Sequence, residues 1–211
     1  MRPATSPAVI WRACASSCRP RRTPRSSPCS SGSAPWPPAR YARAIASYRH
    51  GGGADAIAAI DALIREQPNN AAFHELRGQA LLETGNPRAA IASYRRALQL
   101  APQAPLVRAG LGRALVSSED PAFTDEAIRE LERALSQDPN LPLAYRMLAT
   151  AYGRRGDQGR AQLAIALGHM ADGDFQQAQA IARRAQALLP RGSPGWLRAD
   201  DIVNARPPRR S

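Results

Sequence analysis

His74 and Glu75, in the stretch "FHELRGQALLETGNP", are the residue types with which a zinc protease does its chemistry. Such a site needs two histidines one helical turn apart, so that both imidazoles face one zinc ion, with a glutamate between them as general base. The residue four positions after His74 is Gly78, and the other histidines, His50 and His169, lie far along the chain. This spacing excludes the zinc site, and His74 is expected on the surface of a helix.

Other catalytic chemistry finds no support in the sequence. The three cysteines, Cys14, Cys18 and Cys29, form an odd number in a segment without a periodic core or a nearby histidine. This pattern indicates unpaired thiols rather than a disulfide framework or a zinc site. The run "GGGAD" follows no strand and is expected to be a turn, not a phosphate-binding loop. We therefore expect no catalytic residue, no metal site and no cofactor.

The charge is high but unevenly placed. The chain has 211 residues and a net charge of +12, and all 29 basic residues are arginine. Residues 1–40 hold seven arginines and no acid, so the other 22 arginines and 17 acids leave +5 for the rest. An arginine-only composition indicates a GC-rich coding bias first and phosphate recognition second. No apolar run approaches the roughly 18 to 20 residues that a membrane span needs.

Residues 1–39 are expected to form a disordered arm rich in arginine, proline and serine. Frequent proline prevents a helix, and scarce apolar side chains prevent a core. "AVIW" is too short for a secretory signal, and the prolines obstruct the amphipathic helix of a transit peptide. Translation of an out-of-frame region would also give this composition. Nucleic-acid binding rests on charge alone and is not favoured; it would use Arg19, Arg21, Arg22 and Arg25.

From residue 40 onward the sequence repeats itself. Four alanines recur with sequence numbers that differ by 34, 37 and 34: Ala56, Ala90, Ala127 and Ala161. Three prolines recur with differences of 34 and 37: Pro68, Pro102 and Pro139. A single three-residue insertion in "VSSEDPAFTD" explains both series, and it falls where a turn joins two helices. Three glycines mark the equivalent turn in the other repeats: Gly51, Gly85 and Gly156.

A 34-residue period with two helices per unit resembles the tetratricopeptide repeat. Small residues such as Gly78, Ala90 and Ala97 allow close helix crossings, and Tyr94 is expected to fill the space between units. The resemblance implies an all-α fold, a right-handed α-solenoid of about nine helices over residues 40–190. Residues 191–211 are expected to form a C-terminal cap and tail, with Trp196 and Ile202 covering the last exposed face. Between Pro139 and Pro190 three helices are predicted: 141–154, 158–171 and 174–188.

Such a stack binds peptides in a concave groove lined by the first helix of each repeat. The groove is predicted to contain eight side chains: Tyr41, Tyr48, Glu75, Gln79, Arg113, Arg146, Thr150 and Arg154. Three of them, Arg113, Arg146 and Arg154, could form a positive strip for an acidic segment or a chain terminus. The alternative is that they are ordinary solvated arginines. The chain lacks lysine and the groove asparagines of the co-chaperone type of these repeats, which does not favour that subclass.

The chain from Pro38 onward also resembles the C-terminal repeat region of BepA-like bacterial zinc metalloproteases, relatives of the CAAX prenyl proteases. The resemblance lies in "PARYARAIASYRHGG", "AIDALIREQPNNAAFHELRGQALLETG" and the ending "LPRGSPGWLRADDIV". It implies a binding role and a partner such as a protease domain or an outer-membrane assembly component. It also implies a periplasmic location in the parent family, although this chain shows no signal peptide, so its own localisation is not assigned. The catalytic HExxH domain is absent, and no catalytic residue carries over.

Three hypotheses follow from these patterns. The first is a non-catalytic interaction module, the repeat part of a BepA-like peptidase of envelope protein quality control. The second is a regulatory subunit of a separately encoded zinc metalloprotease. The third is a free-standing adaptor.

Overall fold

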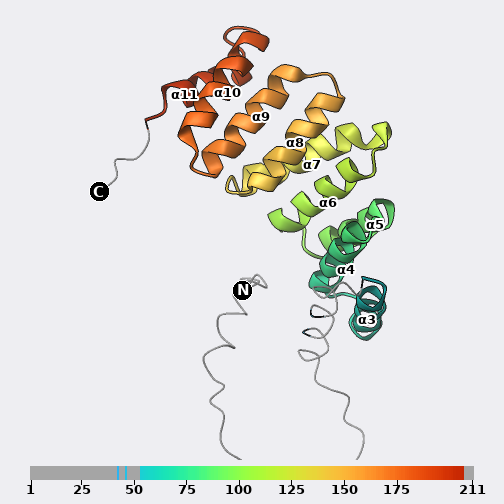
Figure 1. Cartoon of the computed structure of the whole chain (residues 1–211). Helices are drawn as coiled ribbons and strands as arrows, with labels where there is room; N and C mark the ends of the chain where they lie inside the picture. The colour runs from blue at the N-terminus through green and yellow to red at the C-terminus, as the bar shows by residue number, and fades with distance from the viewer. Residues whose placement is uncertain (1–41, 43–45, 47–52, 207–211) are drawn as a thin grey trace, which may run out of the picture.

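The computed structural model describes Ala42, Ala46 and residues 53–206. Ala42 and Ala46 are helical and exposed. Residues 53–206 contain nine α-helices and one 3₁₀ turn (Figure 1). The helices and the 3₁₀ turn η1 are α3 (Gly53–Glu66), α4 (Ala71–Glu83), α5 (Pro87–Leu100), α6 (Pro105–Ser117), η1 (Pro121–Phe123), α7 (Thr124–Gln137), α8 (Pro142–Arg154), α9 (Gln158–Ala171), α10 (Phe175–Leu188) and α11 (Pro194–Asn204).

Local signals at the helix starts explain most of these boundaries. Helices α5, α6, α8 and α11 begin with proline, whose fixed φ suits the first helical turn and whose missing N–H is not needed there. Other starts are capped by side chains that accept hydrogen bonds from free backbone N–H groups. Asn70 accepts from the Ala72 amide, Asp157 from the Arg160 amide and Asp174 from the Gln177 amide.

A residue in the left-handed conformation reverses the chain inside each of the hairpins α4–α5, α6–α7 and α8–α9, and in two of them it is glycine. Gly85 has a φ of 76°, and Gly156 has a φ of 83°. Glu119 stands at the equivalent position of the repeat between them and adopts the same conformation, with a φ of 57°. The third repeat therefore makes its turn with a residue type that prefers negative φ.

The helices pack closely because small residues lie at their crossings. Ala90, Ala97 and Ala127 are fully buried. Tyr94 fills the space between adjacent units, as predicted, with its ring against both Gly78 and Gly110. A Cβ atom at Gly78 would come within 2.8 Å of that ring, so a larger residue would separate α4 from α5.

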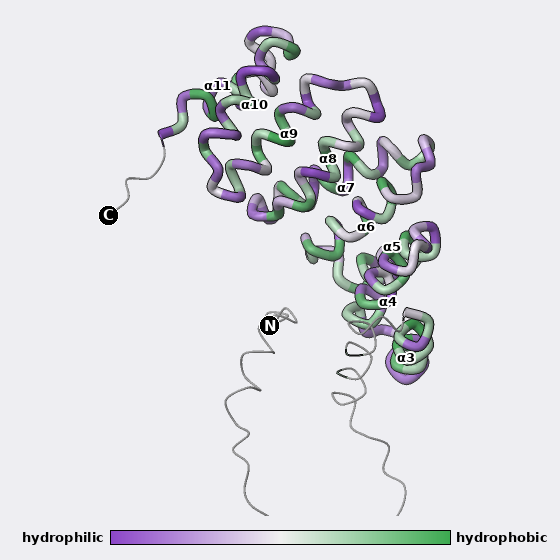
Figure 2. The backbone as a smooth tube through the Cα atoms, viewed as in Figure 1, coloured by the Kyte–Doolittle hydropathy of each residue, from purple (hydrophilic) through white to green (hydrophobic). Residues whose placement is uncertain are grey.

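The stack has an inner row of helices. Each helix packs against the next in sequence, and α4, α6 and α8 also contact one another in succession. In a curved stack the helices that touch across units lie on the shorter, inner side, and α5 and α7 lie on the outer side. Figure 1 shows the curvature, and Figure 2 shows that every helix carries both hydrophobic and hydrophilic residues.

The alternation of inner and outer helices changes after α8. Gly173, with a φ of 78°, joins α9 to α10 as tightly as Gly156 joins α8 to α9. Helix α9 packs against both α10 and α11. The contacts between alternate helices therefore join α4, α6 and α8 in the first part of the stack, and α9 and α11 at its end. A small cluster that includes Leu163, Ala182 and Ile202 forms the core of this terminal part.

The all-α solenoid predicted from the repeats is confirmed within the described residues. The three helices expected between Pro139 and Pro190 are present, two of them starting one residue later than predicted. Helix α11 lies in the segment predicted as a cap, where Ile202 is buried and Trp196 is half-buried. Residues 1–39 lie outside the described residues. In the described part of the chain, none of the helices has the length and apolar character that a bilayer crossing requires.

Candidate functional site

The six predicted groove residues that the structure describes lie on the inner row of helices. Glu75 and Gln79 lie one turn apart on α4, and Arg113 lies on α6. The other three lie one turn apart on α8, at positions 146, 150 and 154. Residues four apart share a helix face, so each set forms a short stripe. Tyr41 and Tyr48 lie outside the described residues.

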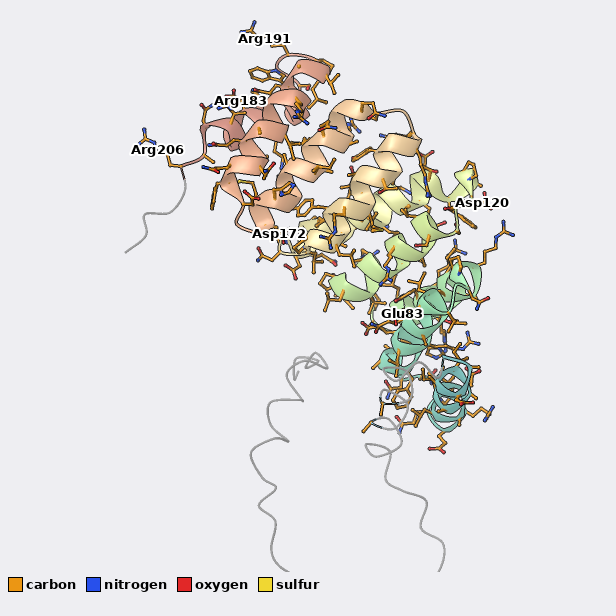
Figure 3. All side chains as sticks on the ribbon, viewed as in Figure 1. Glu83, Asp120, Asp172, Arg183, Arg191 and Arg206 are labelled. Atoms are coloured by element: carbon orange, nitrogen blue, oxygen red, sulfur yellow. The ribbon has the colours of Figure 1, made fainter. Side chains whose placement is uncertain are left out.

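Charged side chains of α4 and α6 surround the Tyr94 hydroxyl. Burial raises the pKa of Tyr94, the negative charges of Glu75 and Glu83 raise it further, and the positive charge of Arg113 lowers it. These side chains therefore lie near one hydroxyl group. Glu83, which was not predicted, lies two turns after Glu75 on the same face of α4 (Figure 3).

Glu75 is a half-buried carboxylate with a perturbed environment. Burial raises its pKa because water is partly removed from the charged form. Among the described residues, no hydrogen bond or ion pair stabilises this carboxylate. An ionisable group of this kind on a concave face is a candidate for ligand recognition.

The arginines of the predicted positive strip differ from one another. Arg146 is exposed, and only its carbonyl is engaged, by the Thr150 hydroxyl at 3.1 Å. The guanidinium of Arg154 donates to the Val116 carbonyl at 2.5 Å, close to the C-terminus of α6. A cation there stabilises the free carbonyls and the negative end of the helix dipole. Arg154 therefore supports the α6–α8 contact, whereas Arg113 and Arg146 are free of ion pairs in the described structure.

Two exposed leucines that were not predicted lie beside these charges. Leu106 on α6 is 53% exposed and Leu143 on α8 is 43% exposed, so both side chains offer apolar surface to a ligand. They occupy the same position in consecutive repeats, as Ala90 and Ala127 do. Leu106 lies two turns before Arg113, and Leu143 lies one turn before Arg146, so they share the same helix faces.

Several charges on the outer side form ion pairs. Arg77 binds Asp61 at 2.7 Å, and Arg95 binds Glu126 at 2.8 Å. Arg108 and Glu130 form a largely buried pair at 2.5 Å. These contacts connect α3 to α4, α5 to α7 and α6 to α7, which identifies them as links between or within repeats.

The residues with metal-binding chemistry are not clustered in the described residues. His74 has its Nε2 atom 2.9 Å from the Pro68 carbonyl, an interaction that fastens the start of α4 to the preceding turn. No group of three or more potential ligand side chains in the described segments could hold a metal ion.

Comparison with known proteins agrees with the fold of this chain. A family model described as "Tetratricopeptide repeat" matches residues 41–105, and the fold continues the same hairpins to α9. Residues 41–105 are therefore similar to the tetratricopeptide repeat family. The chain is 33% identical over 85 residues to the TPR repeat-containing thioredoxin TTL4 of Arabidopsis thaliana. This similarity covers 40% of the chain and only 12% of that relative.

Solved tetratricopeptide repeat structures superpose on most of the chain. A MamA RS-1 double mutant has a TM-score of 0.60 at 17% identity, with 79% of this chain and 90% of that chain covered. YrrB, described as a TPR protein with an unusual peptide-binding site, has a TM-score of 0.59 at 18% identity. That comparison covers 70% of this chain and 75% of YrrB. At these identities the similarity shows the solenoid fold alone.

Proposed function

We propose that the inner face of α4, α6 and α8 binds an extended peptide with alternating apolar and acidic residues. The tetratricopeptide fold suggests protein or peptide binding in general. The observation that carries the finer proposal is the contrast in pairing. Arg113 and Arg146 have no ion-pair partner in the described structure, although the same chain pairs many of its outer arginines.

The exposed leucines indicate that the ligand also carries apolar side chains. Leu106 and Leu143 offer apolar contacts on the same faces as the free arginines. Leu106 and Leu143 lie nearer the starts of α6 and α8 than the arginines do, so a peptide that runs across these helices has leucines on one side and arginines on the other. An extended peptide that alternates carboxylates with apolar side chains satisfies both, because successive side chains point to opposite sides. Glu75 and Glu83 on α4 make the other end of the inner face acidic, so this end suits the basic or uncharged part of a ligand.

The experiment compares two fluorescein-labelled, end-capped peptides by fluorescence anisotropy, one of alternating leucine and glutamate and one of alternating leucine and lysine. We expect the glutamate peptide to bind more tightly and its affinity to fall as salt is raised. Arg113→Glu and Arg146→Glu are each expected to weaken it about tenfold, since each replaces an attraction by a repulsion.

Arg129→Glu on α7 is the matched control. Arg129 is exposed, as Arg146 is, but it lies on the outer side, so the same change in net charge should leave the affinity unchanged. Equal binding of both peptides, or equal losses in Arg129→Glu and Arg113→Glu, would contradict the proposal.

We also propose a zinc metalloprotease domain of the BepA-like class as the partner that presents such a segment. The support is the sequence resemblance of "LPRGSPGWLRADDIV" and the two preceding stretches to the repeat region of that family. The test is co-expression of the full chain with the tagged catalytic domain of a BepA-like peptidase, followed by affinity purification. Recovery of a complex that Arg113→Glu disrupts is expected; recovery of the tagged domain alone would favour a free-standing adaptor.

A further inference from the structure

A second hollow lies on the outer side of the solenoid, between α7 and α9. It has α8 as its floor and the start of α11 along its rim, and its volume is about 480 Å³. Its walls are mainly apolar, with Leu148, Leu163 and Leu167 among them. Tyr145, Arg160 and Arg198 supply most of the polar groups around it. This volume lies within the range of small-molecule sites.

The two preceding repeat junctions have the same groove, but polar contacts cross it there. Between α3 and α5, the Arg77 guanidinium bonds to Asp61 at 2.7 Å and to Ser93 at 2.9 Å. Between α5 and α7, Arg108 bonds to Glu130 at 2.5 Å and to the Pro102 carbonyl at 2.7 Å. An arginine of the floor helix therefore crosses both grooves. The first groove keeps a hollow of about 420 Å³, but Arg65, Arg77 and Arg96 are among its lining residues, so its walls are strongly charged.

At the third junction the residues that cross the groove are replaced. When α9 is aligned on α7 through Ala161 and Ala127, Ala164 takes the position of Glu130. The same alignment puts Leu163 and Leu167 where α7 carries Arg129 and Arg133. On α8, the alignment that matches Leu143 to Leu106 puts Tyr145 at the position of Arg108. The groove is thus lined by apolar side chains, and no arginine of α8 crosses it.

Helix α11 shields part of this apolar lining from water. Helix α11 packs against α9, and Pro194 and Gly195 at its start border the hollow. Gly195 also lies close to Leu163. The start of α11 therefore covers part of the apolar surface, and a cavity remains beneath it.

One cation at this cavity has no charged partner. Arg160 lies 3.4 Å from Asp157, and the Tyr152 hydroxyl donates a short hydrogen bond to Glu132. Arg198 has neither an ion pair nor a hydrogen bond from its side chain within the described residues. It lies near the hydroxyl of Tyr145, on which its charge acts.

We propose that this outer cavity binds a small apolar carboxylate, with the carboxylate on Arg198 and the apolar body along α8 between Tyr145 and Tyr152. The helical rise between the two tyrosines on α8 is about 10 Å, which suits a ligand of the size of octanoate. A guanidinium presents two N–H groups in the geometry that a carboxylate accepts. The apolar body would replace water against Leu148, Leu163 and Leu167.

A small molecule fits this cavity better than a peptide does. A peptide main chain brings an N–H and a C=O at every residue, and each needs a hydrogen-bonding partner once it is buried. The walls of the cavity hold no Asn or Gln side chain, and the carboxylate of Glu132 is already engaged by Tyr152. The site is also distinct from the inner face, so it stands independently of the peptide-binding proposal.

The test is isothermal titration of the full-length chain with octanoate below its micelle concentration, with 1-octanol as the uncharged probe. We expect saturable one-to-one binding of octanoate. Arg198→Gln should weaken it about tenfold while leaving the weaker binding of octanol unchanged. Ser136→Trp, at the exposed rim on α7, should block both probes by covering the cavity.

Arg183→Gln is the matched control, because Arg183 is an exposed arginine of α10 that does not line the cavity (Figure 3). It should bind octanoate like the unaltered chain. Absence of saturable binding, or the same affinity in Arg198→Gln, would overturn the proposal. Displacement of octanoate by an equal concentration of an acetylated tetrapeptide that ends in leucine would overturn the choice of a small molecule. Circular dichroism of each variant shows that the helices are intact.

Discussion

The inner and outer sides of the solenoid are rich in the same charged residues but engage them differently. On the outer side Arg77, Arg95 and Arg108 each reach a carboxylate on a neighbouring helix. On the inner side Arg113 and Arg146 reach none in the described structure, and the half-buried Glu75 is also unpaired there. Outer charges therefore hold repeats together, whereas inner charges are available to a ligand.

The difference follows from helix spacing. Inner helices touch across repeats, so their exposed faces form one continuous surface whose side chains point into the concavity. Outer helices leave grooves between them, and a long arginine can cross such a groove to a partner. The third outer groove differs, since apolar residues replace the crossing arginine and line the cavity there.

The largest expected effect comes from breaking the Arg108–Glu130 pair with Arg108→Met. Both side chains are only 14% and 13% exposed, so the substitution leaves a poorly hydrated carboxylate. We expect a loss of about 3 kcal/mol in the free energy of unfolding, measured by urea denaturation. The matched inner substitution Arg113→Met should cost less than about 0.5 kcal/mol, the usual size at a surface without specific contacts.

The double variant Arg108→Met/Glu130→Leu distinguishes charge from packing. Removing both charges should restore most of the lost stability, because the Glu130 carboxylate, which Arg108→Met leaves with only the exposed Arg133 as its partner, is then gone. Equal losses in Arg108→Met and Arg113→Met would mean that the two faces do not differ in the way described.

A smaller loss in the free energy of unfolding is expected from Gly78→Ala, which affects the packing of α4 against the Tyr94 ring between the inner and outer sides. Alanine normally stabilises a helix relative to glycine by roughly 0.5–1 kcal/mol. Here its Cβ would come within 2.8 Å of the Tyr94 ring, and Gly110 limits movement on the other side of that ring. We expect a net loss of about 1–3 kcal/mol, measured by thermal unfolding.

Tyr94→Leu makes the same test from the other side. With the ring gone, Gly78→Ala should become neutral or stabilising. A stabilising Gly78→Ala in the unaltered chain would show that the ring does not fill this space.

The fold was predictable from the sequence because its signals are local and periodic. Small residues that recur once per repeat, together with prolines after the second helices, determine which helices cross and where they end. The helices of residues 142–188 followed from the same reasoning, including the change after α8. The left-handed turn at Glu119 was not predicted, since glutamate gives no sign of positive φ.

The sites were less predictable because they depend on pairing between repeats. Sequence spacing placed Arg113, Arg146 and Arg154 on inner helices, but only the contact with the Val116 carbonyl separates Arg154 from the other two. The outer cavity was missed as well. Its signal was present, because Leu163 and Leu167 replace arginines of the preceding repeat, but this substitution has meaning only once α11 is seen to border the groove.

The smallest expected effect, and the sharpest test of an unpaired inner face, is Glu75→Gln. The pKa of Glu75 is raised above the ordinary value of 4.5, so the folded state holds its proton more tightly than the unfolded state. Stability must then fall as pH rises from that ordinary value through the raised one, because the unfolded chain releases the proton first. Above the raised pKa the half-buried carboxylate is charged and unpaired, so Glu75→Gln should increase the free energy of unfolding there, at pH 7, by an amount on the order of 0.5 kcal/mol, measured by thermal unfolding. This gain should disappear by pH 4, where the carboxylate is mostly protonated in both states.

A loss of stability at pH 7 in Glu75→Gln would mean that Glu75 has a partner in the folded chain. Glu75 would then not be available to a ligand at the acidic end of the proposed groove.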